Sequence, residues 1–311
     1  MKIGVSFVKL ARNFFTLLIL CVLIGCVRNP FLAENFVLTN DKLQVPHIHQ
    51  EQEVMIMRIN QTLNQHLSQK MRSDLLFERG VLYDSLGLWE LAHYDFIHAL
   101  TLQPKNPAIY NYLGLYWLLD NNYSIAVEAL NGVLELDPDY EFAHFNLGLT
   151  FYYMERFSLA EQNLLRFYER DKSNPYAVLW LYFNELKFSP ASAKENLVKR
   201  STALSPQSWG TYIVQHYLGQ LSITELWQKS QSFVKNSIEE SAKFNEILTE
   251  TYFYLAKQQL NIGQTEKAKQ LFKLAIANQV YNFVEYRFAL LEAAKLGLIQ
   301  AKSANGFSVS P

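Results

Sequence analysis

The sequence predicts an all-α protein built from repeated pairs of helices. Apolar residues recur at the spacing of a helix face from Gln52 to about Gly297. Within that range a pattern of small and bulky residues returns every 34 residues, as Pro104 and Pro138 illustrate. Of the 311 residues, 50% are hydrophobic and 18% are charged, so the chain can form a large core and is not a disordered polymer.

Composition excludes several classes of function. There are 28 basic and 29 acidic residues, so no excess of positive charge exists to bind a phosphate backbone, and nucleic acid is not expected as a partner. The two cysteines, Cys21 and Cys26, are too few for a disulfide scaffold or a four-cysteine metal cluster.

The first 25 residues predict a segment that directs export. Lys2, Lys9 and Arg12 give a positive start without an acidic residue, and an apolar run of 11 residues follows from Phe14 to Ile24. A helix that spans a bilayer needs about 20 apolar residues. The shorter run behind a positive start therefore indicates a secretory signal peptide over 1–25.

The end of that run resembles the lipobox of bacterial lipoproteins. Leu23, Ile24, Gly25 and Cys26 supply a hydrophobic residue, a variable one, a small one and cysteine. The resemblance implies that a signal peptidase cleaves between Gly25 and Cys26, and that Cys26 then carries a covalent diacylglycerol and an N-acyl chain. Such a set of acyl chains anchors a protein stably to a membrane, and no other cofactor is expected. The alternatives are an ordinary secretory peptide, or an uncleaved anchor, that merely contains cysteine.

The mature chain would have 286 residues (311 − 25), no free thiol, and a net charge of −4 from 25 basic and 29 acidic residues. By resemblance to bacterial lipoproteins, Val27 is not the aspartate associated with retention in the inner membrane. This favours the outer membrane of a Gram-negative bacterium, with the folded part facing the periplasm.

Residues 26–50 are predicted to be a lipidated tether, because they show no helical period and contain Pro30 and Pro46. His47 and His49 have no third ligand in view, so no metal site is predicted there. A first helix is predicted over 51–72, where no proline or glycine occurs. Its apolar face holds Val54, Ile56, Ile59, Leu63 and Leu67.

Residues 73–174 contain three repeats in phase. The first has Leu76, Gly80, Tyr83, Gly87, Ala92, Phe96, Ala99 and Leu102 at the pattern positions. The second has Tyr110, Gly114, Trp117, Asn121, Ala126, Leu130, Val133 and Leu136, and the third has His144, Gly148, Phe151, Glu155, Ala160, Leu164, Phe167 and Arg170. The pattern resembles the tetratricopeptide repeat, which implies the fold class: an all-α tetratricopeptide-repeat helical solenoid with irregular middle helices.

Each pattern position has a physical reason. The three glycines are expected where the two helices of a repeat approach closely, opposite small alanines on the second helix. The aromatic residues Tyr83, Trp117 and Phe151 are expected to fill the space between neighbouring repeats. Prolines end each second helix. The third repeat has Lys172 in place of proline and Pro175 three residues later, which predicts a slightly longer connection.

The remaining chain divides into three predicted parts. Residues 175–248 are predicted to be helical but out of register, with breaks at Pro190 and Pro206. Residues 249–299 are predicted to hold a fourth repeat and a closing helix that covers the end of the solenoid. Residues 300–311 are predicted to be a disordered tail.

No sequence motif for catalysis is present, and the chain is predicted not to be an enzyme. It lacks the motifs of zinc proteases, serine hydrolases, phosphate loops and dinucleotide-binding turns. His144 occupies a core position of its repeat, and Glu239 and Glu240 point about 100° apart on a helix, so neither is a catalytic candidate. An enzyme would instead need a polar pocket within 175–248.

A concave protein-binding surface is predicted on the first helix of each repeat, as in tetratricopeptide domains. It consists of Phe77, Val81, Asp84, Asn111, Leu115, Leu118, Phe142, Phe145, Leu149 and Tyr152. Such an apolar and aromatic wall suits a peptide or a helix. Phe77 and Val81 replace the first two residues of the clamp that binds C-terminal carboxylates in chaperone-binding members, which argues against that ligand. Alternatively, the wall is covered by the N-terminal or middle helices of the same chain.

A closer resemblance covers nearly the whole mature chain. Residues 75–88, 133–138 and 282–291 resemble segments of the NlpI lipoproteins of gamma-proteobacteria, and the order of lipobox, three repeats, irregular middle and late repeat is the same. The resemblance implies a homodimeric outer-membrane adaptor. It would bring a periplasmic tail-specific protease (Prc-like) together with a wall endopeptidase (MepS-like) and so limit peptidoglycan cleavage during growth and cell division. An assembly factor for outer-membrane proteins is the alternative.

Overall fold

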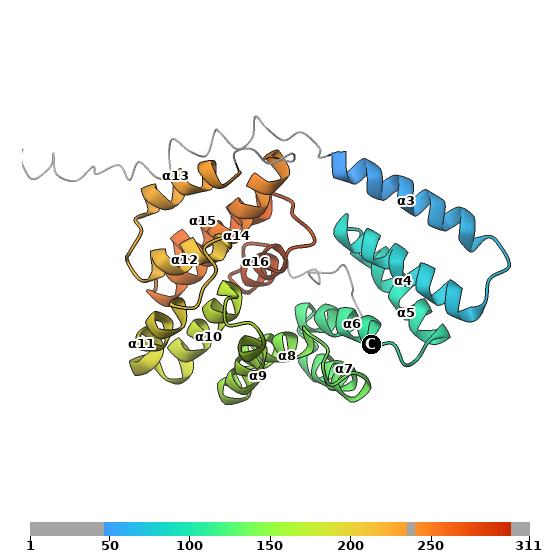
Figure 1. Cartoon of the computed structure of the whole chain (residues 1–311), viewed down its shortest axis with the longest axis horizontal. Coiled ribbons are helices and arrows are strands. Elements are labelled where there is room, and N and C mark those ends of the chain that lie inside the picture. The colour runs from blue at the N-terminus through green and yellow to red at the C-terminus, as the bar shows by residue number, and fades with distance from the viewer. Residues whose placement is uncertain (1–46, 235–239, 300–311) are drawn as a thin grey trace, which may run out of the picture. The chain divides into compact units, whose positions relative to one another are not determined.

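The computed structural model describes residues 47–234 and 240–299. The chain divides into two compact units, Met1–Val45 and Pro46–Pro311. The first unit lies outside the described residues, and so do the predicted signal peptide, Cys26, most of the tether and the predicted tail. Every regular element in the described ranges is an α-helix, from α3 to α16, which confirms the predicted all-α class (Figure 1).

The predicted first helix is in fact two helices. α3 spans His47–Leu63 and α4 spans Gln69–Ser85, with a break between them. The break follows from Ser68, whose side chain accepts a hydrogen bond from the backbone N–H of Met71 at 3.2 Å and caps α4. The prediction of one helix over 51–72 was wrong because it relied on the absence of proline and glycine. The predicted tether also ends earlier than residue 50, because α3 begins at His47.

The next helices form antiparallel pairs with the spacing that the sequence predicts. α4 pairs with α5 (Trp89–Leu102), α6 (Pro107–Leu119) with α7 (Tyr123–Leu136), and α8 (Ala143–Tyr153) with α9 (Phe157–Arg170). The turn inside each pair passes through one residue with positive φ: Gly87 at 74°, Asn121 at 61° and Glu155 at 60°. These residues are 34 apart, so the same left-handed turn closes all three pairs.

The three pattern glycines allow the paired helices to approach closely, as predicted. A Cβ atom built on Gly80, Gly114 or Gly148 would lie 2.7–2.8 Å from Phe96, Leu130 or Leu164. The partner side chain lies one helical turn after the predicted alanine, which is itself fully buried in each repeat. Close contact between the helices of a pair therefore depends on glycine in the first helix.

The connection after the third repeat is not longer than the others. α9 ends at Arg170 and α10 begins at Pro175, which leaves four residues, as between α5 and α6. Pro175 begins α10 just as Pro107 begins α6, and the side chain of Asn174 or Asn106 caps the helix in each case. The predicted longer connection was wrong because the proline belongs to the start of the next helix.

The repeat spacing also continues into the region predicted to be irregular. α10 (Pro175–Phe188) and α11 (Pro190–Ser201) form a fourth pair, in which Ala193 and Leu197 are buried. The second helix starts one residue early for the period, and Tyr182 stands where the pattern has glycine. The prediction that 175–201 lie out of register was therefore wrong, because only the signature residues had changed.

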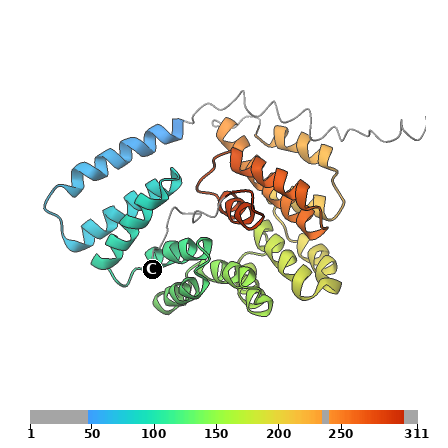
Figure 2. The same ribbon diagram turned by 180° about the vertical axis from the view of Figure 1, so that it is seen from behind.

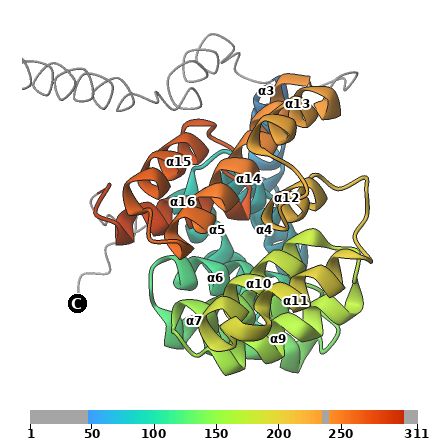
Figure 3. The same cartoon turned by 90° about the vertical axis from the view of Figure 1, so that its left-hand side faces the viewer.

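Five helices complete the fold. α12 (Trp209–Tyr217) and α13 (Ile223–Val234) are followed by α14 (Glu240–Asn261), α15 (Thr265–Ala277) and α16 (Val284–Lys295). α14 and α15 are the pair expected from 249 onward, and they turn at Gly263, where φ is 77°. Figure 3 shows α14, α15 and α16 grouped beside the pairs that run from α6 to α11.

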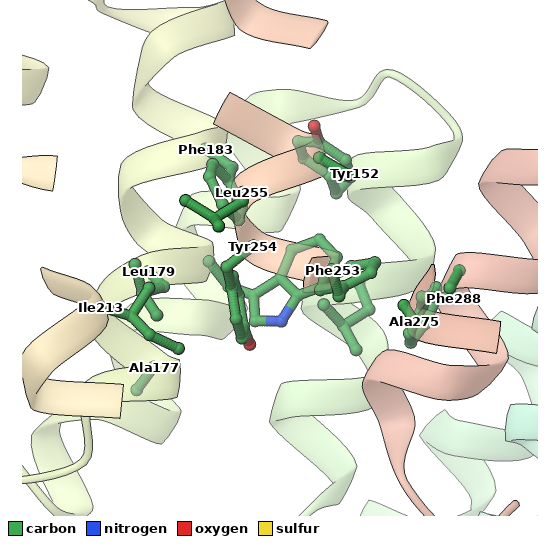
Figure 4. Packing of buried hydrophobic residues seen from close by; sticks show 14 of the residues in the cluster. Tyr152, Ala177, Leu179, Phe183, Ile213, Phe253, Tyr254, Leu255, Ala275 and Phe288 are labelled. Atoms are coloured by element: carbon green, nitrogen blue, oxygen red, sulfur yellow. The ribbon is translucent and has the colours of Figure 1, made fainter. Parts of the chain in front are cut away.

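Two clusters of buried side chains form the core of the described residues. The larger one surrounds Trp180 and includes Phe183, Phe253, Tyr254 and Phe288 from α10, α14 and α16 (Figure 4). The smaller one lies between α4, α5 and α6. Trp117 packs against both clusters, so the core is continuous along the repeats.

Within the described ranges, none of the helices has both the length and the apolar character that are needed to cross a bilayer.

Candidate protein-binding surface

The ten residues of the predicted concave wall lie on α4, α6 and α8, or at the start of α8 for Phe142. Five of them are buried: Asp84, Leu118, Phe145, Leu149 and Tyr152. Phe77, Val81, Asn111 and Leu115 are partly buried, and Phe142 is 46% exposed. In this structure the five buried residues offer no surface to a second protein.

The last helix of the chain accounts for this burial. α16 lies on the inner side of the first helices of the repeats, where α4, α6, α8 and α10 face it (Figures 1 and 2). Phe288 of α16 stacks on Tyr153 of α8, with ring centroids 5.2 Å apart, and meets Trp180 of α10 at 5.5 Å. The wall is therefore covered by the same chain, but by its C-terminal helix and not by the N-terminal or middle helices that the sequence suggested.

A buried ion pair joins α16 to the first repeat. Arg287 pairs with Asp84 of α4, and the hydroxyl of Tyr116 donates a hydrogen bond to the same carboxylate at 2.6 Å. Burial disfavours the charge of Arg287, but the adjacent Asp84 raises its pKa above the ordinary value. Removal of either partner would leave a buried charge without compensation, so this pair fixes the position of α16 against α4 and α6.

A second buried pair joins α16 to α14 and α8. Lys257 donates to Glu292 at 2.6 Å, and the hydroxyl of Tyr153 donates to the same carboxylate at 3.0 Å. The ammonium group also lies over aromatic rings, 5.0 Å from the centroid of Tyr152 and 5.6 Å from that of Trp180. Burial opposes ionisation of Glu292, but Lys257 lowers its pKa overall.

A third polar group on the inner side consists of two carboxyls. Tyr176 donates to Glu250 at 2.5 Å, and Tyr254 donates to Glu285 at 2.9 Å. Burial, together with the negative charge of Glu285, raises the pKa of Glu250 to about 8, and burial also raises the pKa of Glu285. Each carboxyl has a tyrosine hydroxyl as partner and neither has a cation at hydrogen-bond distance, so this pair tolerates the protonated form.

The charged residues of α16 are the part of the wall that sequence reasoning missed. Glu285, Arg287 and Glu292 stand on a helix whose other buried positions are apolar. Their partners lie on helices distant in sequence, so no local motif marks them. The available signal was the presence of three charges on the face that also holds Phe288 and Leu291.

The described residues do not suggest chemistry of their own. They contain no cluster of three or more histidine, cysteine, aspartate or glutamate side chains that could bind a metal. His144 is buried and its Nδ1 lies 3.0 Å from the amide oxygen of Asn163, which suits a structural role. Glu239 lies outside the described residues, as do the side chains of His47, His49 and Glu240.

Comparison with known proteins decides the family. No family profile matches the chain. It is 52% identical over 301 residues to the "Lipoprotein NlpI homolog" of Haemophilus influenzae, and the match covers 94% of each protein. The chain belongs to the NlpI lipoprotein family.

Solved structures also resemble this NlpI-family chain. A tetratricopeptide repeat protein from Parabacteroides merdae is 17% identical, with a TM-score of 0.49 over 81% of this chain and 95% of that one. The pilF protein of Pseudomonas aeruginosa is 16% identical, with a TM-score of 0.41 over 72% of this chain and 99% of that one.

Proposed function

We propose that the chain is a lipid-anchored periplasmic adaptor without catalytic activity of its own. It is acylated at Cys26 after cleavage behind Gly25 and is held at the outer membrane. The observation that carries this proposal is the 52% identity to a lipoprotein NlpI homolog along 94% of the chain. The partners implied by family resemblance are a tail-specific protease and a wall endopeptidase, and the function is control of peptidoglycan cleavage during growth and division.

The internal contacts support a scaffold role. Arg287–Asp84 and Lys257–Glu292 tie the end of the chain to its repeats, so the outer faces of the helix pairs are presented on a fixed frame. A fixed frame raises the effective concentration of two proteins bound to it and requires no covalent step. The partly buried and exposed members of the predicted wall, such as Phe142, stay candidates for partner contact.

The chain is also proposed to form a homodimer through α3. This helix packs on α4, yet Val54, Met55 and Met57 are 40%, 39% and 56% exposed. A row of exposed apolar side chains on one helix marks a surface that associates with another. Self-association would place two copies of each partner site on one assembly.

Reconstitution tests the adaptor function directly. The purified protease would be incubated with the endopeptidase, with and without the full chain, and loss of the endopeptidase followed over time. We expect the chain to speed degradation about tenfold or more, since it brings enzyme and substrate together. An unchanged rate would count against the proposal.

Two cellular readouts separate the remaining alternatives. Loss of the gene should raise the level of wall endopeptidase, whereas depletion of barrel proteins would favour the assembly-factor function. A Cys26→Ser chain should move from the membrane fraction to the soluble periplasm, and its persistence in the membrane would indicate an uncleaved anchor.

A further inference from the structure

A groove with a volume of about 860 Å³ runs along the outer side of α7. We call it the α7 groove. It is lined by Tyr110 and Trp117 of α6 and, among others, by Ile125, Glu128, Gly132 and Glu135 of α7. None of these six residues belongs to the predicted concave wall.

The α7 groove combines apolar and acidic side chains that the described part of the chain leaves uncovered. Ile125 is 46% exposed, and Leu136 at the other end of the groove is 39% exposed. Tyr110 and Trp117 are seven residues apart, so they lie about two helical turns apart on the same side of α6. Glu128 and Glu135 have the same spacing on α7, and no ion pair among the described residues includes either of them.

The surrounding sequence has a single sign of charge. Residues 106–155 contain seven acidic residues and not one lysine or arginine. The only base that the structure brings to them by an ion pair is Arg170, which meets Asp139 at 3.4 Å. The groove therefore has a negative potential that is not compensated by its own repeat, and it repels phosphate and anionic lipid.

Gly132 is the observation that points most directly to an occupant. It lies within α7, where glycine costs about 1 kcal/mol relative to alanine. Gly80, Gly114 and Gly148 have close neighbours that exclude a Cβ atom, but a Cβ atom on Gly132 would meet nothing within 4 Å. Neither packing nor a positive φ explains this glycine in the described structure. Its effect is to leave the backbone of α7 open at the middle of the groove.

We propose that the α7 groove binds a segment of a partner protein that carries lysine or arginine beside aliphatic or aromatic side chains. The cations would lie near Glu128 and Glu135, and over the rings of Tyr110 and Trp117. One apolar side chain would enter the space that Gly132 leaves open. The inference rests on the adaptor function in that the occupant is another protein, and it adds a second surface, on the opposite side from the helix that fills the inner wall.

The test uses the full chain in zwitterionic nanodiscs and a designed probe. The probe is a peptide of about 14 residues, with leucine and lysine on opposite faces of a helix and one photo-crosslinking side chain. We expect crosslinks to α6 and α7 and a measurable Kd by fluorescence anisotropy. Gly132→Trp should weaken binding about tenfold or more without disturbing the fold, because its side chain enters open space.

Matched charge changes give the control. The Glu128→Lys, Glu135→Lys double variant should weaken binding by about tenfold or more, whereas Glu90→Lys with Glu195→Lys should change it less than about twofold. Both pairs change net charge equally, and Glu90 and Glu195 are exposed residues of α5 and α11. Equal effects of the two pairs, or unchanged binding by Gly132→Trp, would overturn the proposal.

Two further outcomes would assign the groove to another occupant and so overturn the inference. If removal of residues 300–311 strengthens peptide binding, the chain's own C-terminal segment is the occupant. If Gly132→Trp converts a dimer to a monomer in sedimentation, the groove is a contact between copies. These outcomes do not depend on the protease assay, so failure of the groove and failure of the adaptor function can be told apart.

Discussion

Lys257 and Glu292 show how single side chains hold the inner wall together. Both are buried, and the ammonium group has the carboxylate on one side and the rings of Tyr152 and Trp180 on the other. Burial of each charge alone would be costly, so the pair persists only because each residue compensates the other. Arg287 and Asp84 repeat the arrangement at the other end of α16.

The Glu292→Gln variant should lose about 3–5 kcal/mol of unfolding free energy, because Lys257 then stays buried without its anion. The Lys257→Met, Glu292→Leu double variant should recover most of that loss, since no charge is then buried. Urea unfolding followed by circular dichroism measures both. Glu266→Gln, in an exposed pair with Lys269, is the control and should change stability by about 0.5 kcal/mol or less. A loss no larger than in the control would contradict this account.

Two glycines with different surroundings give the second prediction. Gly148→Ala should destabilise the fold by about 1–3 kcal/mol, because the new Cβ atom would lie 2.7 Å from Leu164. Gly132→Ala should stabilise it by up to about 1 kcal/mol, since its Cβ atom meets no neighbour and alanine favours the helix. Thermal unfolding of the two variants should therefore shift in opposite directions. A shift in the same direction would show that the packing assigned to the repeats is incorrect.

At the scale of elements, α16 joins helices that are far apart in sequence. Its contacts reach α4 through Asp84, α8 through Tyr153 and α14 through Lys257. Its N-terminal end also carries Glu285, next to Glu250 of α14. The stability of the α14–α16 contact therefore depends on the protonation of two acids that have no cation at hydrogen-bond distance.

The stability of the protein should fall as pH rises from about 5 to 8. The folded state keeps a proton on Glu250 up to a pKa of about 8, whereas the unfolded chain loses it near the ordinary value of 4.5, so ionisation favours unfolding in that interval. The loss should be roughly 2–4 kcal/mol, and Glu250→Gln should remove most of it. Thermal melts across this pH range measure the effect. Glu90→Gln on the surface should keep the full pH dependence, and a wild-type Tm that does not fall with pH would sink this prediction.

The elements show which features of the fold a sequence can reveal. The pairs from α4 to α9 were predictable because glycine, turn residue and proline recur at fixed positions, and each has a local physical cause. The pair α10 and α11 was missed, since Tyr182 occupies the glycine position and the period slips by one residue. The break at Ser68 was missed because a serine cap is a weak signal beside the absence of proline.

The concave site was predictable only in outline. The wall residues follow from the repeat, but their burial depends on α16, which meets them across about 200 residues of chain through pairs such as Arg287 and Asp84. Single charges on a helix do not reveal such distant partners. The α7 groove was not predictable either, because it requires knowing that a Cβ atom on Gly132 would meet no neighbour.

At the scale of the whole molecule, the exposed apolar face of α3 is the surface available for self-association. Met57→Glu should weaken dimer formation by about tenfold or more, because Met57 is 56% exposed and a charge there would be buried on association. Sedimentation over a range of concentrations measures it. Ile262→Glu is the control: that side chain is 63% exposed near the turn between α14 and α15, and the change should leave the dimer intact. Equal dimerisation of Met57→Glu and wild type would remove α3 from the interface.

The helix that completes the inner wall is also among the last parts of the chain to be synthesised and exported. Until residues 284–295 arrive, Asp84 lacks Arg287, and Lys257 lacks Glu292. A product that stops short of α16 would hold uncompensated charges and exposed aromatic rings, and would be open to quality-control proteases. Placement of the final helix thus couples a completed translation product to resistance against degradation.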